Sequence, residues 1–194
     1  MLRTFLRLFL ALHAVVGAFG SSTSAMQYHK REMGNGHFII FMYGAIVPGD
    51  TRQLLKVINH TPSGDIFGFA LHSPGGDIDE AYRLALYIRS VHGLTIIGDR
   101  NICAAACFLP FSVGRIKLVH PESKIIVHGT GSADGLDNVA ALNATNKIAG
   151  YARKLGVPET IIRKMVMQAP GEVEPLSRAD LVSMGAEFPA DAGR

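Results

Sequence analysis

Strand-like and helix-like segments alternate through the first half of the chain, and this alternation constrains the fold more than any other feature. The strand-like runs are apolar and rich in β-branched and aromatic side chains, whereas the helix-like runs repeat apolar residues every three or four positions. The predicted strands are residues 37–43, 66–71 and 94–97, and the predicted helices are residues 48–60 and 78–92. This order predicts an α/β fold of stacked βαβ units around a mostly parallel sheet.

The second half of the chain is mainly helical in pattern. We predict a helix at 103–114, a strand at 124–128, and C-terminal helices at 138–155, 158–167 and 177–184. Ser177 and Asp180 have the spacing of a capping box at the start of the last helix. A chain of 194 residues that is 48% hydrophobic is long and apolar enough to form one domain with a sizeable core. That domain is assigned to residues 37–188, after a flexible arm at 26–36 and before a tail at 189–194.

The N-terminus has the pattern of a signal peptide over residues 1–25. Arg3 and Arg7 give a basic start, residues 5–19 are mostly apolar, and small residues follow that are suited to cleavage after Gly20 or Ala25. The alternative is an uncleaved membrane anchor, but the apolar run is shorter than the roughly 20 residues of a spanning helix. The expected location is therefore the periplasm or the extracellular medium, with no stable membrane span after cleavage.

Composition excludes two classes of function. The formal charge of +3 includes Arg3 and Arg7 of the predicted signal peptide, and the remaining Lys and Arg residues form no basic stripe with interleaved aromatics. Nucleic-acid binding is therefore not expected. No segment resembles a nucleotide cradle, so no cofactor is expected, and no metal site is expected either.

Two cysteines, Cys103 and Cys107, are the whole cysteine content. In an oxidising compartment an even pair favours a disulfide, and the four-residue spacing could place both on one helical face. A regular helical turn holds the two Cβ atoms too far apart, so a bridge requires a distorted helix start. A bridged and an unbridged pair both remain open; metal binding is the weaker alternative, because no further His or Cys lies close by in sequence.

Three short segments carry residues suited to chemistry. Residues 72–77 read HSPGGD and join a strand to a helix, a place where glycines leave backbone N–H groups open to a developing oxyanion. Residues 103–108 read CAAACF at another predicted strand-to-helix junction. A buried strand then ends in His128. The glycine turn and the histidine are each, taken alone, more often structural than catalytic, and the small residues of the second segment suit either a core helix or a peptide-binding site.

Together the three segments resemble the Clp protease proteolytic subunit and its relatives, which include signal peptide peptidases and exported Clp-like proteins. The resemblance covers roughly residues 38–185 and implies a Clp protease/crotonase-like fold. It also implies that Gly75, Gly76 and Ala106 supply oxyanion donors and that His128 is the base. The exported relatives carry a serine nucleophile within Cys-Ala-Ser-Ala-Cys, and here Ala105 occupies that position.

The acid that orients the histidine is also altered in this comparison. Val173 aligns with it, and the neighbouring Glu172 and Glu174 are the candidate replacements.

An alanine has no proton or lone pair with which to attack a carbonyl, so Ala105 cannot be a nucleophile. The first interpretation is a peptidase scaffold without turnover that binds a peptide or an unfolded protein segment, or assembles into a homo-oligomer. The second is an active serine endopeptidase represented by an inactivated variant. In the third, Cys103 or Cys107 acts as a displaced nucleophile. A crotonase-type enzyme acting on a coenzyme A thioester is a fourth.

Overall fold

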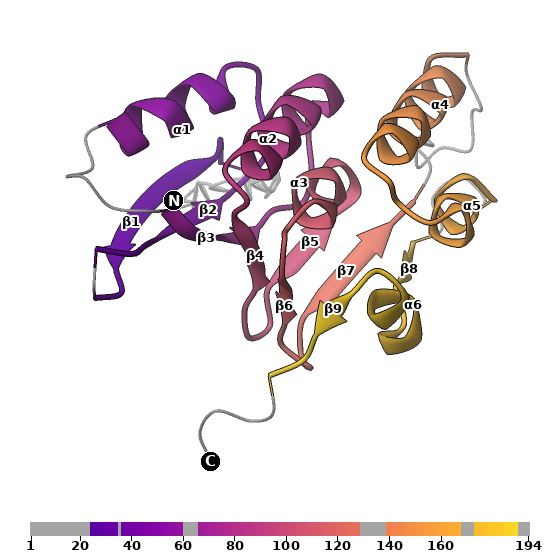
Figure 1. The fold of residues 1–194 in the computed structure, drawn as a ribbon. Coiled ribbons are helices and arrows are strands. Elements are labelled where there is room, and N and C mark those ends of the chain that lie inside the picture. Colours follow the sequence, from indigo (N-terminus) through magenta and orange to yellow (C-terminus); the bar gives the residue numbers. More distant parts are fainter. Residues whose placement is uncertain (1–23, 35, 60–65, 129–138, 168–172, 190–194) are drawn as a thin grey trace, which may run out of the picture.

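The computed structural model describes residues 24–34, 36–59, 66–128, 139–167 and 173–189. A six-stranded sheet has the order β1-β2-β3-β4-β6-β9, and all of its neighbouring pairs are parallel except β1 with β2 (Figure 1). Its strands are β1 Gln27–Glu32, β2 Phe38–Tyr43, β3 Ile66–His72, β4 Leu94–Ile97, β6 Lys117–Val119 and β9 Ala186–Glu187. The predicted α/β class and mostly parallel sheet are confirmed.

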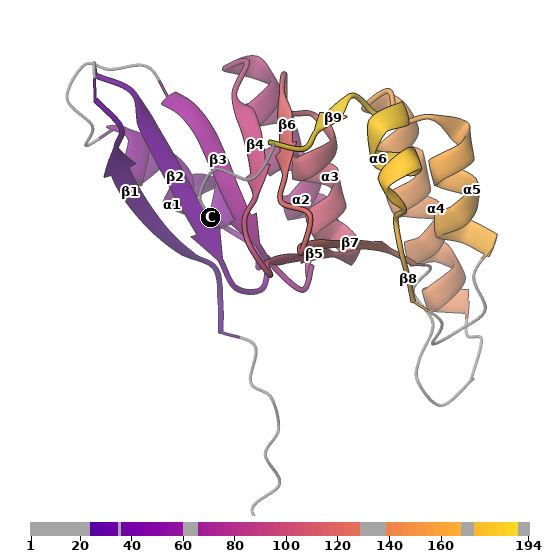
Figure 2. The same ribbon diagram turned by 90° about the horizontal axis from the view of Figure 1, so that it is seen from below.

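A smaller sheet and six helices complete the described structure. The sheet has the order β5-β7-β8, with strands β5 Ile102–Ala104, β7 Lys124–Val127 and β8 Glu174–Pro175. The helices are α1 Asp50–Asn59, α2 Ile78–Ser90, α3 Phe108–Ser112, α4 Val139–Lys154, α5 Glu159–Met167 and α6 Arg178–Ser183. Helices α1, α2 and α3 lie along one face of the main sheet, and α4, α5 and α6 form a group beyond it (Figures 1 and 2).

The core lies between the main sheet and the helices that cover it. The apolar stripe of α2 explains the packing, because Leu84 and Ile88 are completely buried, as is Phe69 on β3. Burying each such side chain contributes about 2 kcal/mol. The C-terminal helices join the same core through Ile162 and Met165 of α5. The structure is therefore one packed body.

Two boundary predictions are wrong. Gln27–Glu32, expected within a flexible arm, forms β1, because its backbone pairs with β2 from Gln27 opposite Tyr43 to Glu32 opposite Phe38. The helix expected from residue 103 begins late: Ile102–Ala104 is strand β5, Ala105–Cys107 is a 3-10 turn, and only then does α3 start. The capping box of Ser177 and Asp180 is confirmed.

The expected signal peptide lies almost entirely outside the described residues. Ser24 and Ala25 are described, and they belong to the fold, since the Ala45 N–H donates to the Ser24 carbonyl at 2.8 Å and Ala25 pairs with Ala45. Among the described residues, none of the helices has both the length and the apolar content to cross a membrane.

A buried carboxylate joins α1 to α2. Glu80 is 3% exposed, accepts the Thr51 N–H at 2.7 Å and pairs with Arg83 at 2.6 Å. Burial alone would raise its pKa, but the hydrogen bonds from Thr51, Gly49 and Arg83 outweigh burial and lower the pKa to about 2. The ionised carboxylate therefore contributes to stability.

This carboxylate predicts acid sensitivity. Because the folded pKa lies below the unfolded value near 4.5, its contribution is complete above pH 4.5 and is lost as the pH falls toward 2. Urea unfolding should show a difference of about 3 kcal/mol between the native chain and Glu80→Gln at pH 7 that shrinks toward pH 2.5. A difference that is independent of pH would contradict this assignment.

Candidate active site

The turn at Ser73-Pro74-Gly75-Gly76 is held rigidly from both sides. On one side Ser73 pairs with β5, because its N–H donates to the Ile102 carbonyl at 2.8 Å and its carbonyl accepts the Ala104 N–H at 3.0 Å. On the other side Ile46 donates to the Gly75 carbonyl at 2.8 Å and accepts the Asp77 N–H at 2.9 Å. The turn therefore has little freedom to shift relative to β5.

The N–H groups of this turn have different partners. The prediction that Gly75 is an oxyanion donor is wrong, because its N–H donates to the buried Ser73 Oγ at 3.1 Å and is not open to a ligand. The Gly76 N–H has no acceptor among the described residues, and Gly76 is exposed. Of the two glycines, Gly76 is therefore the available donor for an oxyanion.

Ala105 sits directly against this turn. A Cβ built on Gly75 would lie 2.8 Å from the Ala105 Cβ and 3.0 Å from the Ala106 nitrogen, which explains why only glycine fits here. Ala105 itself has φ of +49°, a left-handed conformation that non-glycine residues seldom adopt and that costs of order 1–3 kcal/mol. A strained backbone at a strand-to-helix turn is a feature that the nucleophile positions of other hydrolases share.

The disulfide between Cys103 and Cys107 is present and encloses Ala105. Their Cα atoms are 5.3 Å apart, within the usual range, because Cys103 lies on a strand and the chain turns sharply at Ala105 before α3. Both cysteines are fully buried. The interpretation of Cys103 or Cys107 as a displaced nucleophile is therefore wrong, since a bridged cysteine has no thiolate.

The bridge predicts the thiol content of the protein. Protein recovered from an oxidising compartment should have no free thiol when it is denatured without reductant and treated with a thiol reagent, and two after reduction. Two free thiols before reduction would contradict the bridge.

Strand pairing brings the His128 segment beside Ala105. Strands β5 and β7 run parallel with Ala104 opposite Ile126, so their carboxyl ends lie side by side. Ala105 follows directly after β5, and His128 follows directly after β7. His128 is half-buried at this edge. The structure thus places the expected nucleophile position and the expected base on adjacent strand ends.

The register of β7 with β8 identifies the residue across from His128. The two strands are antiparallel, with Ile126 opposite Pro175 and Val127 opposite Glu174. Continuing this register by one residue places Val173 opposite His128. Glu174 is therefore paired with Val127 and not with His128, and Glu172 lies outside the described residues. The position aligned with the orienting acid is the one that this continued register places opposite His128, and here it is an exposed valine.

His72 helps to position the site, and the sequence did not predict this role. Its Nδ1 accepts the Ile102 N–H at 3.0 Å, and its ring contacts Tyr43 edge-on at 6.0 Å between centroids. This hydrogen bond ties the end of β3 to the start of β5, and therefore ties the glycine turn to the Ala105 segment. Histidine next to the Ser-Pro-Gly-Gly turn was the available signal, but its partner 30 positions away was not visible in the sequence.

A cleft extends from the glycine turn toward α4. Its lining residues come from the start of α2 and the first half of α4, and they include Gly76, Asp77, Ala140, Asn143, Ala144 and Lys147. Lys147 donates to Asp79 at 2.5 Å, and the Tyr151 hydroxyl donates to the same carboxylate at 2.7 Å. Lys147 and Tyr151 lower the pKa of Asp79. These contacts fix α4 next to the turn.

Comparison with known proteins identifies the fold. No family model matches the chain, and no curated protein does either. Among solved structures, the chain is similar to ClpP1 from Listeria monocytogenes, with TM-score 0.54 and 14% identity over 78% of this chain and 92% of that one. It is also similar to a serine-to-alanine mutant of the 1510-N membrane-bound stomatin-specific protease. The TM-score is 0.55 and the identity is 16%, over 80% of this chain and 78% of that one.

A third structure extends the similarity beyond proteases. An enoyl-CoA hydratase/isomerase from Marinobacter aquaeolei has TM-score 0.56 and 10% identity, over 83% of this chain and 70% of that one. The chain therefore has the Clp protease/crotonase fold, as the sequence resemblance implied. The fold is shared by peptidases and by enzymes that act on coenzyme A thioesters, so function rests on the residues of the site.

Proposed function

We propose that the protein is an exported Clp-like peptidase scaffold that binds extended peptide segments and does not turn them over. The observation that carries the proposal is the contact of the Gly75 turn with Ala105, next to the strand end that leads to His128. This arrangement is the one expected of a serine-peptidase site in which a methyl group replaces the nucleophilic hydroxyl. A coenzyme A enzyme would need no histidine at that strand end.

The cleft between the turn and α4 supports peptide binding. The first eight residues of α4, Val139 to Asn146, carry no charge, and Val139 and Leu142 are 73% and 56% exposed. These two residues do not line the cleft but are adjacent in sequence to its lining residues Ala140 and Asn143. Exposed apolar side chains near a groove are typical of surfaces that bind another polypeptide. The open Gly76 N–H at one end of the cleft is a donor for a bound peptide carbonyl.

Binding without cleavage is the expected result for the chain as it stands. Fluorescein-labelled, unfolded casein should bind with a rise in fluorescence anisotropy, and gel analysis should show no cleavage after long incubation. Leu142→Asp should weaken binding several-fold, because it places a charge on the apolar face of α4, whereas Leu86→Asp on α2, another exposed leucine, is the matched control. Binding that is equally unaffected by both variants, or no binding at all, would reject peptide binding at this cleft.

The second candidate is an active peptidase of which this chain is an inactivated form. The retained turn and His128 favour it, while Val173 opposite His128 is a second departure that a single inactivating substitution does not explain. We therefore place it second.

A further inference from the structure

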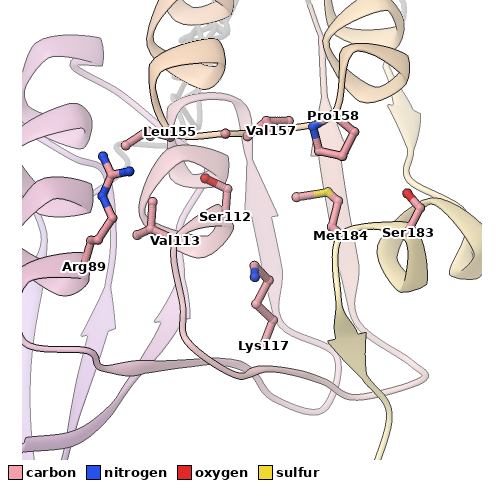
Figure 3. A pocket seen from close by; sticks show the side chains of 10 residues that line it. Arg89, Ser112, Val113, Lys117, Leu155, Val157, Pro158, Ser183 and Met184 are labelled. Atoms are coloured by element: carbon pink, nitrogen blue, oxygen red, sulfur yellow. The ribbon is translucent and has the colours of Figure 1, made fainter.

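A second cavity lies outside the candidate site, between the main sheet with its covering helices and the group of C-terminal helices. It has a volume of about 280 Å³ and is bordered by the ends of α2 and α3, the start of β6, the turn between α4 and α5, and the end of α6. Figure 3 shows Arg89 and Lys117 on two sides of Ser112 and Val113, with Met184 reaching in from the residue after α6. No residue of the candidate site lines this cavity.

The charges that line the cavity are all of one sign. Arg89 and Lys117 are its charged residues, and none of its lining residues is acidic. Lys117 donates to the Gly114 carbonyl at 3.0 Å, and neither cation pairs with a carboxylate among the described residues. Burial lowers the pKa of Lys117. An anion in the cavity would compensate both charges and accept the remaining N–H groups.

The neutral part of the lining determines what kind of anion fits. The side opposite Lys117 is formed by Leu155, Val157 and Pro158, and the Met184 side chain points into the space between (Figure 3). The hydroxyls of Ser112 and Ser183 donate to carbonyls of their own helices, at 2.8 and 2.6 Å, so they offer a ligand no proton. A ligand therefore meets Arg89 on one side and Lys117 on another, with aliphatic carbon across from Lys117 (Figure 3).

We propose that this cavity binds a small aliphatic carboxylate. The carboxylate lies between Arg89 and Lys117, and a short branched chain packs against Val157, Pro158 and Met184. A volume of about 280 Å³ is at the lower limit for small-molecule sites, which restricts the ligand to a short chain. A free acid and the C-terminal residue of a peptide share this chemistry.

Binding is measured on the whole protein by titration with isobutyrate, with isobutyramide as the uncharged analogue of the same shape. N-acetylvaline and N-acetylvalinamide form a second pair that represents a peptide C-terminus. We expect each acid to bind and each amide to bind at least ~10-fold more weakly, the effect of losing a charge-assisted contact. NMR shifts of the Met184 and Val113 methyl groups should follow the same titration.

Substitutions locate the site independently. Lys117→Met and Arg89→Met keep the side-chain length and remove one cation each, and each should weaken isobutyrate binding ~10-fold. Arg89 is exposed on α2, so its replacement leaves the fold intact, and Lys124→Met on β7 is the matched control at an exposed lysine outside the cavity. Equal affinity for acids and amides, or equal loss in the Lys124→Met control, would overturn the proposal.

Discussion

Ala105→Ser should convert the protein from one that does not react with a fluorophosphonate probe into one that is labelled at residue 105. The serine would occupy the left-handed position against the Gly75 turn, beside the strand end that leads to His128. A serine hydroxyl with a nearby imidazole is the arrangement that generates a nucleophile. Ala104→Ser is the control, because that residue lies in β5 and precedes the turn. Labelling is quantified by intact mass.

Two further changes in the Ala105→Ser background separate reaction at the site from incidental labelling. Adding His128→Ala should slow labelling by ~10²-fold or more, because a general base contributes about that much. Adding Val173→Asp should speed it, because the register of β7 and β8 places residue 173 opposite His128, where a carboxylate can orient the imidazole. If neither change altered the labelling rate, His128 would not be the base that activates a serine at position 105.

Gly76→Ala should destabilise the fold by about 3 kcal/mol. Gly76 has φ of +140°, and a Cβ there would overlap the carbonyl of Ile46, whose N–H and carbonyl each make one hydrogen bond to the turn. Neither the backbone nor Ile46 can move without breaking those bonds. Urea unfolding measures the change.

Gly150→Ala is the matched control for this substitution. Gly150 lies inside α4 with no atom within 4 Å of a built Cβ, so alanine there should stabilise the helix by up to about 1 kcal/mol. If both alanines had the same effect, the tight contact of Gly76 with Ile46 would be refuted.

The elements that the sequence predicted well are those whose pattern repeats. The spacing of Leu84 and Ile88 requires one buried helical face, and α2 has it. The sequence did not predict strand β1, because QYHKRE has no apolar alternation. These residues form a strand because their backbone hydrogen-bonds to the edge of β2. Cys103 and Ala104 were predicted as helix because small residues suit one, but pairing with Ser73 and β7 overrides that preference.

Some residues of the candidate site could be predicted from the sequence and others could not. Ala105, His128 and the glycine turn could be found from short motifs and their resemblance to a family. Local motifs cannot show which N–H groups are engaged, and Gly75 donates to Ser73 Oγ, which leaves Gly76 as the open donor of the turn. Nor could spacing decide between Glu172, Val173 and Glu174, because that choice depends on the register of β8 against β7.

We propose that Ala105 occupies the nucleophile position of a peptidase-like site, with the Gly76 and Ala106 N–H groups as its oxyanion donors. A crystal structure of the Ala105→Ser protein after reaction with the fluorophosphonate tests it most directly. We expect a phosphoryl oxygen within about 3 Å of both nitrogens. A phosphoryl oxygen that points to solvent, with neither N–H donating to it, would show that these N–H groups do not form an oxyanion hole.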